Sequence, residues 1–259
     1  MSIRRMLQIA VVVVGIACAP AYASTATSEV TDMWWNPAEP GWGVNVTLQS
    51  DVAFLTFFVY DSNRNPVWYT AAAHFSPATS GWTGDLIATK GAWFGGAYSN
   101  YTARKAGTVT FAVSQLNQAT LTYTVDGVTV SKAVQRQTWA NENFTGDYLG
   151  GYSVNNTNCS GAVQNGVEEA GGLVTVVHNG SAIAMTAATA LSTCTYSGTY
   201  TQTGKLGRVS GNYTCSNEIQ GGFAMAELTP TVSGFTGRLV GQNQFCQFSG
   251  QFGGVRRSH

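Results

Sequence analysis

The sequence predicts an all-β protein made of two antiparallel domains. Thirty glycines and 12% aromatic residues in 259 residues disfavour helices and favour short twisted strands joined by tight turns. Apolar and polar residues alternate from Trp42 to Gln49, as in a strand with one buried face. Asp126-Gly127 has the chemistry of a type I′ hairpin turn. We expect a sandwich-like or barrel-like domain, followed by a small up-and-down barrel stapled by two disulfides.

The first 23 residues have the features of a secretory signal peptide. Arg4 and Arg5 precede an apolar segment over residues 7–19, and residues 21–23 fit the small-x-small cleavage pattern. This segment is shorter than the roughly 20 residues that a spanning helix needs. We therefore expect an exported, soluble protein, periplasmic or extracellular, with no membrane span in a mature chain that starts at Ser24.

The charge of the chain argues against nucleic acid as a partner. Charged residues make up 10% of the sequence and the formal net charge is zero. Removal of Arg4 and Arg5 leaves two more acidic than basic side chains. Proteins that bind nucleic acid usually carry a basic stripe, which this sequence lacks.

The first domain is expected over residues 31–140. Its predicted strands cover residues 42–49, 52–60, 67–74, 85–89 and the two arms of a hairpin at Asp126-Gly127. The strand over 52–60 is apolar on both faces, which predicts a central place in the sheet. In the hairpin, Leu121 falls opposite Lys132 on an apolar face, and the other face carries hydroxyl groups. The sheet of this domain should therefore have one solvent-exposed face.

A longer pattern in this domain resembles a known module. Its parts are Trp34-Trp35-Asn36-Pro37-x-Glu39-x-Gly41-Trp42-Gly43, Tyr60-Asp61, Pro66-x-Trp68-Tyr69, Val125-Asp126-Gly127-Val128, Lys132 and Arg136-Gln137. Together they resemble a β-rich module of exported proteins in Gram-negative bacteria, whose function is not established. The resemblance covers residues 33–139 and implies export and a β fold. It supplies no catalytic or binding residues, and Pro40 replaces a residue that is more often small and polar.

The second domain is expected over residues 143–255. A hydroxyl residue, a glycine, a variable residue and usually an aromatic one recur at residues 145–148, 197–200, 210–213, 236–239 and 249–252. Such glycines mark bends where a curved sheet closes. About eight strands fit this domain, which is enough for a small barrel. The rhythm resembles avidin-like and lipocalin-like barrels, although their ligand-binding residues find no matching motif.

Turn chemistry sets two hairpin registers in the second domain. Gly204-Lys205 fits a type II′ turn, which places Thr203 opposite Leu206 and Cys194 opposite Cys215 in a non-hydrogen-bonded pair. Such a pair brings the Cα atoms within reach of a disulfide. The predicted bonds are therefore Cys194–Cys215 and, by elimination, Cys159–Cys246. The second register assumes a type I′ turn at Asn179-Gly180, with His178 opposite Ser181, Val176 opposite Ile183 and Val174 opposite Met185.

The sequence offers little catalytic chemistry. It lacks the common nucleophile, zinc, phosphate-loop and dinucleotide motifs, so we expect no catalytic residues, metal or cofactor. His74 and His178 are interpreted as hydrogen-bonded surface residues. Asp61, Asn63 and Asn65 match the first positions of a calcium loop, but Pro66 and Ala72 occupy positions that need glycine and a bidentate acid.

Aromatic residues of the first domain are the best candidates for ligand contacts. The candidate set is Trp34, Trp35, Glu39, Trp42, Trp68, Tyr69 and Trp82. Two interpretations are open: the rings close the core, which is favoured, or some of them form an exposed platform that stacks on sugar rings or another ligand with an apolar face. Trp34 and Trp35 are adjacent and point opposite ways in an extended chain, so at least one should meet solvent, ligand or the second domain.

Three functional hypotheses follow. The first is a non-enzymatic binding or structural protein that recognises an envelope glycan or a partner protein through these aromatics. The second is a glycosidase-like hydrolase that uses Glu39 with Asp61 or Asp85, which requires two carboxyl groups in one cleft. The third is a barrel that holds a small apolar ligand, which requires an interior that Tyr and Met side chains do not fill.

Overall fold

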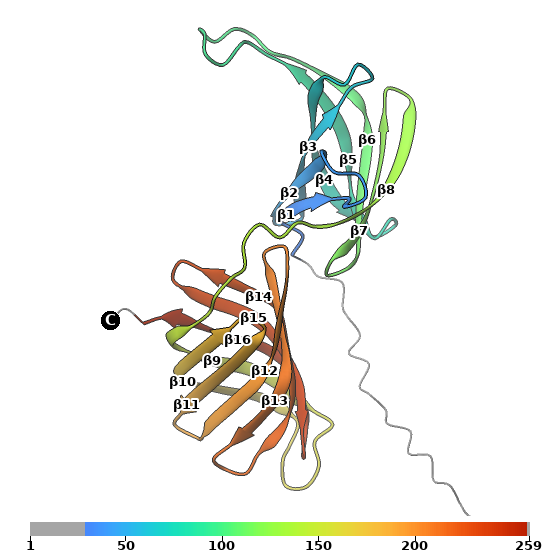
Figure 1. The fold of residues 1–259 in the computed structure, drawn as a ribbon. Helices are drawn as coiled ribbons and strands as arrows, with labels where there is room; N and C mark the ends of the chain where they lie inside the picture. Colours follow the sequence, from blue (N-terminus) through green and yellow to red (C-terminus); the bar gives the residue numbers. More distant parts are fainter. Residues whose placement is uncertain (1–28, 258–259) are drawn as a thin grey trace, which may run out of the picture.

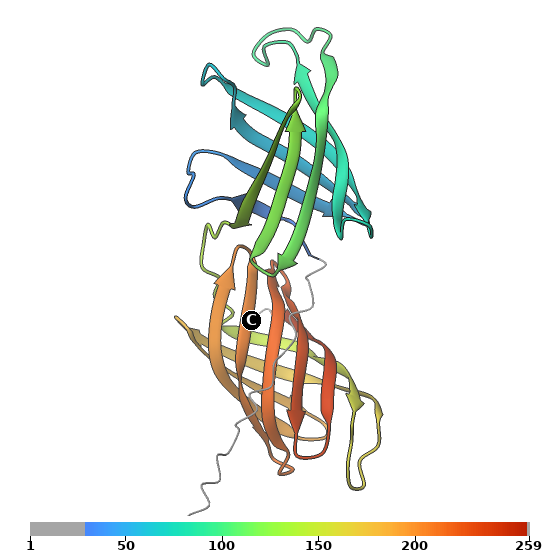
Figure 2. The same ribbon diagram turned by 90° about the vertical axis from the view of Figure 1, so that its right-hand side faces the viewer.

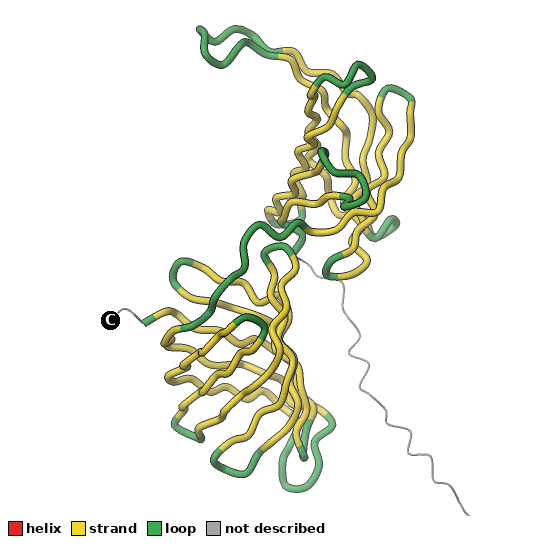
Figure 3. Tube along the Cα trace, in the orientation of Figure 1, coloured by secondary structure: helices red, strands yellow, loops and turns green. Residues whose placement is uncertain are grey.

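The structure, a computed structural model, describes residues 29–257. The predicted signal peptide lies outside the described residues. The described chain consists of strands and loops, without a helix (Figure 3). It forms two closed antiparallel barrels of eight strands each (Figure 1), so the all-β prediction is confirmed. No helix among residues 29–257 is long and apolar enough to cross a membrane.

The N-terminal barrel is a closed sheet in which each strand pairs with its neighbours in the sequence. Its strands are β1 (Asp32–Trp35), β2 (Gly43–Gln49), β3 (Val52–Tyr60), β4 (Pro66–Ser76), β5 (Gly81–Lys90), β6 (Thr102–Gln115), β7 (Gln118–Val125) and β8 (Val128–Arg136). The barrel closes where β1 pairs with β8. The Asp126-Gly127 turn has positive φ at both residues, as type I′ requires.

Strand β3 shows what closure does to an apolar strand. Its inward residues Ala53, Leu55 and Phe57 are buried, whereas Phe58 and Tyr60 on the outer face are 51% and 58% exposed. The strand does pair on both sides, as expected for a central strand. However, nothing among the described residues covers its outer face, so the second apolar face is surface.

The end of the N-terminal barrel near the second barrel is closed by a buried arginine. Arg136 is 2% exposed and its guanidinium lies 4.5 Å from the ring centroid of Trp34. It donates to the carbonyl oxygen of Leu116 at 2.7 Å and to Asp32 Oδ2 at 3.1 Å. A buried charge needs such partners, and these tie β8 to β1 and to the turn between β6 and β7.

The C-terminal barrel repeats the same up-and-down order. Its strands are β9 (Gly146–Thr157), β10 (Gly166–Asn179), β11 (Ala182–Thr189), β12 (Thr193–Thr203), β13 (Leu206–Cys215), β14 (Gln220–Thr231), β15 (Gly234–Asn243) and β16 (Gln247–Arg256). Strand β9 closes the barrel by pairing with β10 and β16. The predicted β12–β13 register, with Thr203 opposite Leu206, is confirmed.

The predicted register of the β10–β11 hairpin is wrong. His178 pairs with Ile183 rather than Ser181, and Val176 pairs with Met185. The turn residues are Gly180 and Ser181, and φ is +60° at Gly180 but not positive at Asn179. Glycine therefore takes the first position of a type II′ turn, not the second position of a type I′ turn. Asn179 remains in the strand.

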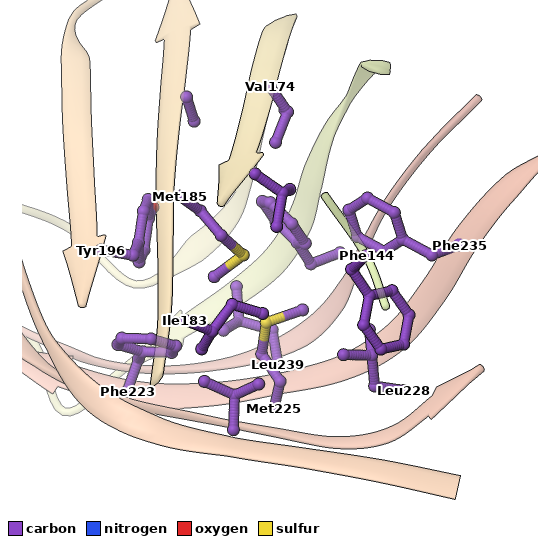
Figure 4. Packing of buried hydrophobic residues seen from close by; sticks show 14 of the residues in the cluster. Phe144, Val174, Ile183, Met185, Tyr196, Phe223, Met225, Leu228, Phe235 and Leu239 are labelled. Carbon is purple, nitrogen blue, oxygen red and sulfur yellow. The ribbon is translucent and has the colours of Figure 1, made fainter. Parts of the chain in front are cut away.

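Both predicted disulfides are present. Cys194 and Cys215 face each other across β12 and β13, and Cys159 joins Cys246 between two loops. The middle of the barrel is packed with aromatic, methionine and aliphatic side chains (Figure 4). This packing leaves no room in the middle for the apolar ligand of the third hypothesis. A cavity lies towards the end of the barrel that carries the disulfides.

The two barrels meet end to end, with the β12–β13 turn against the N-terminal barrel (Figure 2). The backbone N–H of Lys205 donates to Asp32 Oδ2 at 3.0 Å, and that of Gly204 donates to Thr138 Oγ1 at 2.9 Å. Asp32 thus accepts from Arg136 of one barrel and from the turn of the other. The end of each barrel away from this contact is called its distal end.

Candidate functional site

The distal end of the N-terminal barrel gathers residues that are far apart in the sequence. Its connections are residues 36–42, 61–65, 91–101 and the turn at Asp126-Gly127 (Figure 1). In an antiparallel barrel every second connection opens at the same end. The loop over residues 36–42, Asp61, the Asp126-Gly127 turn and the nearby Lys132 therefore come together around one opening, whereas Arg136 and Trp34 lie at the other end.

Glu39 holds the 36–42 loop to the barrel. Lys132 lies opposite Leu121, which is fully buried, so its side chain starts from the inner face of the sheet. Its Nζ donates to both carboxylate oxygens of Glu39, at 2.8 and 2.7 Å. Trp42 Nε1 donates to Glu39 Oε2 at 3.1 Å. The hydrogen bond from Lys132 is the main reason why the pKa of Glu39 is lowered, so this carboxylate is ionised at neutral pH.

The candidate aromatics are divided between the core and the surface. Trp34 is fully buried, Trp82 is 7% exposed, and both belong to the core. These two are therefore removed from the proposed contact surface. Trp35, Trp42 and Tyr69 are partly buried. Trp68 is the exposed member of the set, at 54%.

A pocket of about 470 Å³ lies beside Trp68. It exists because β4 and β5 pair at Tyr69–Ala88 but not further towards the distal end. Strands β5 and β6 remain paired as far as Lys90–Thr102, so their hairpin diverges from β4. Trp68 and Tyr69 line one side of the pocket, and Lys90, Thr102 and Arg104 line the other.

Arg104 is oriented by a bidentate ion pair with Asp126. Its two terminal nitrogens reach the two carboxylate oxygens of Asp126, at 2.5 and 2.8 Å. Both side chains are more than half exposed, and exposed pairs contribute little stability. The pair therefore serves to hold a planar cation beside the pocket, close to the β7–β8 turn.

The connection over residues 91–101 forms an arm that projects from the barrel (Figures 1 and 2). Its four aromatic side chains are largely exposed: Trp93 74%, Phe94 98%, Tyr98 82% and Tyr101 63%. This arm was not predicted from the sequence. The available signal was a cluster of aromatics among glycines and small polar residues without strand alternation.

Three more exposed rings lie on the outer wall of β3 and β4. Phe58 is the cross-strand partner of Trp68, and Tyr60 is the partner of Pro66. We call this set the aromatic face: Phe58, Tyr60, Trp68, Trp93, Phe94, Tyr98 and Tyr101. Exposed apolar patches of this kind mark interaction sites in proteins.

The three carboxylates of the hydrolase hypothesis have separate partners. Asp61 accepts the backbone N–H groups of Asn63 and Asn65 at 2.9 and 2.8 Å, which caps a turn. Asp85 lies on the outer wall and pairs with Lys105 at 2.6 Å. Glu39 pairs with Lys132, whose side chain starts from the inner face. No hydrogen bond within residues 29–257 links any two of them.

Neither histidine predicted to be a surface residue supplies catalytic geometry. His74 is exposed on the outer face of β4. His178 is hydrogen-bonded, as expected, through Nε2 to the carbonyl oxygen of Gly180 at 2.9 Å. It is nevertheless buried, because the rings of Phe144 and Tyr200 pack against it. Across the described part of the chain, no three His, Cys, Asp or Glu side chains form a group that fits a metal ion.

No protein-family model matches this chain, and no curated protein or solved structure matches it significantly. The fold and the distal site define a disulfide-bonded protein of two β-barrels with an exposed aromatic face.

Proposed function

We propose that this protein is an exported, non-enzymatic binding protein that holds an extended glycan of the cell envelope on its aromatic face. One observation carries the proposal. Seven largely exposed rings lie on the arm, on β3 and on β4, and one of them borders the 470 Å³ pocket. Rings that serve only the core would be covered, as Trp34 is.

The chemistry of the face favours a saccharide. The C–H faces of pyranose rings are apolar and pack on exposed aromatic rings, which also offer a polar edge in tyrosine. Thr102 and Tyr69 add hydroxyl groups at the pocket, Lys90 adds a positive charge, and Arg104 adds N–H donors whose charge is balanced by Asp126. The hydroxyl and N–H groups favour a ligand rich in hydroxyl groups, and Lys90 can also pair with an acidic group of the polymer. The spread of the rings over three elements favours an extended chain over a single sugar.

Export is part of the same proposal. The predicted signal peptide motivates it, and the two disulfides are consistent with an oxidising compartment. We also propose that the N-terminal barrel belongs to the exported module that its sequence resembles. The contact of Glu39 with both Trp42 and Lys132 supports this, since it gives three separated motif residues one structural role.

A glycan array probed with the mature protein, followed by titration with the best polysaccharide, tests the function. Tryptophan fluorescence should change on binding, because Trp68 and Trp93 are both exposed. Trp68→Ala and Trp93→Ala should each weaken binding about tenfold, since each removes an anchor worth over about 1 kcal/mol.

Trp139→Ala is the matched control. Trp139 is 72% exposed but lies in the connection between the barrels, away from the aromatic face. Its loss should leave the affinity unchanged. Equal losses in all three variants, or no binding to any polysaccharide, would contradict the proposal. Binding only to an envelope protein would assign the face to protein recognition instead.

A further inference from the structure

A second cavity lies inside the C-terminal barrel, at its distal end. Its volume is about 110 Å³. It opens between two turns. Leu191 lines it from the β11–β12 turn, and Asn217 lines it from the β13–β14 turn. The packed core of Figure 4 forms its floor, where Tyr196 and Leu239 belong to both.

Aromatic rings make up much of the wall. Tyr196 and Tyr213 stack with their ring centroids 5.3 Å apart, and Phe248 meets Tyr213 at 6.0 Å. Tyr152 adds a further ring from β9. Rings grouped in this way attract a cation, because the face of each ring carries partial negative charge.

A carboxylate faces the same cavity. Glu168 lies opposite Val154, a buried residue, so its side chain starts from the inner face of the barrel. It accepts the hydroxyl of Tyr152 at 2.7 Å and Asn156 Nδ2 at 2.8 Å. Both donors are neutral, and Asn156 is itself only 8% exposed. They orient the carboxylate without neutralising it.

The negative charge of Glu168 has no cationic partner within residues 29–257, where the ion pairs involve other carboxylates. The surrounding phenols remain neutral at neutral pH. Burial raises the pKa of Tyr196 and of Tyr213, and the charge of Glu168 raises both further. The cavity therefore combines one uncompensated negative charge with uncharged aromatic walls.

Both disulfides lie at this end of the barrel. Cys194 and Cys215 line the cavity, and Cys159–Cys246 joins the β9–β10 and β15–β16 loops. Covalent links hold the rim in one arrangement before any ligand arrives, which lowers the entropic cost of binding. A preformed rim is what a dedicated small-molecule site needs.

We propose that this cavity binds a small organic cation, an ammonium group on a compact apolar body, between the tyrosine rings and Glu168. This site is independent of the aromatic face, which lies on the other barrel. The small volume excludes a polymer, and the carboxylate disfavours an anion. The aromatic faces offer cation–π contacts but no oxygen or nitrogen ligands for a metal ion, and this favours an organic cation.

Choline and its neutral isostere 3,3-dimethyl-1-butanol provide the test. Isothermal titration of the mature protein with each should show choline binding about tenfold more tightly, because only choline gains the cation–π and carboxylate contacts. Phosphatidylcholine vesicles form a third arm, which distinguishes a lipid headgroup from a free ammonium compound. Equal affinity for choline and the isostere would overturn the proposal. So would the absence of binding both to free choline and to phosphatidylcholine vesicles.

Two neighbouring glutamates give a matched pair of variants. Glu168→Gln keeps the side-chain size and an acceptor for Tyr152 but removes the charge, so choline affinity should fall about tenfold. Glu169→Gln changes the adjacent residue, which bonds Ser153 on the outer wall, and should leave choline binding unchanged. Near-UV circular dichroism verifies that both variants keep the native packing. Equal choline affinity in the two variants would overturn the role of Glu168.

Discussion

Glu39 is the residue whose charge state is easiest to follow. Its pKa is lowered mainly by the hydrogen bond from Lys132. A carboxyl group whose pKa is lowered by folding stabilises the protein at pH values above its ordinary pKa of 4.5. This contribution is lost as the pH falls through the lowered pKa of the folded protein. We therefore predict that the contact with Trp42 persists at pH 4.5 and is lost only in stronger acid.

The indole N–H signal of Trp42 in a nitrogen–proton NMR spectrum measures this directly, because that group donates to Glu39. Glu39→Gln should remove the acid-induced change. Asp61→Asn is the control, since Asp61 also has a lowered pKa but bonds only its own turn. A transition above pH 4.5, or one that survives in Glu39→Gln, would show that Lys132 does not hold this carboxylate.

Single residues were predictable where local rules decide their role. The Cys194–Cys215 bond follows from a correct hairpin register. The contact of Glu39 with Lys132 spans 93 residues. No local pattern encodes such a contact, because it depends on how the barrel closes. For the same reason, Glu168 was not selected as a site residue.

At the scale of elements, the arm over residues 91–101 is expected to contribute to ligand binding but not to the folding stability of the barrel. Its rings are at least 63% exposed, so they contribute little to the folding of the barrel. Lys90 and Thr102 are paired at its base, which permits replacement of residues 91–101 by the two-residue turn Asn-Gly. We predict that this replacement does not lower the unfolding free energy, since a shorter loop raises it by up to about 1.5 kcal/mol, and that it abolishes glycan binding.

Urea unfolding and titration with the same polysaccharide measure the two effects. The Trp139→Ala protein serves again as a control with an equal loss of exposed indole. Full retention of binding without the arm would restrict the site to β3 and β4. A large loss of stability would mean that the arm supports the fold and is no independent binding element.

Elements were predictable from alternation and turn chemistry, within limits. Glycine suits the first position of a type II′ turn and the second of a type I′ turn, so Gly180 alone did not fix the β10–β11 register. Strand β3 was expected to be central because both faces are apolar. In a closed barrel the outer face is surface, so Phe58 and Tyr60 belong to the aromatic face instead.

The whole molecule places its two proposed sites at opposite ends. The barrels meet end to end, so the arm and the disulfide-bearing rim point away from each other (Figure 1). Each site lies towards the distal end of one barrel, while the β12–β13 turn, Asp32 and Thr138 form the contact between the barrels. The contact therefore sets the spacing and orientation of the two sites.

A substitution at Gly204 can test the contact between the barrels. It lies in a type II′ turn with φ of +59°, and a Cβ atom at this position would overlap Asp32 Oδ2 and approach Arg136. Gly180 occupies the same kind of turn with φ of +60°, and nothing lies within 4 Å of the corresponding position. Alanine at either glycine therefore introduces similar backbone strain, of order 1–3 kcal/mol. Only Gly204→Ala also disrupts the contact between the barrels.

We predict that Gly204→Ala loosens the arrangement of the two barrels and that Gly180→Ala does not. The turn must move away from Asp32, which breaks the hydrogen bond from Lys205. Small-angle X-ray scattering should show a larger radius of gyration for Gly204→Ala, and proteases should cut the connection at residues 137–145 faster. If the two alanine variants give the same scattering and cleavage, the β12–β13 turn does not hold the barrels together, and the spacing of the two sites has another origin.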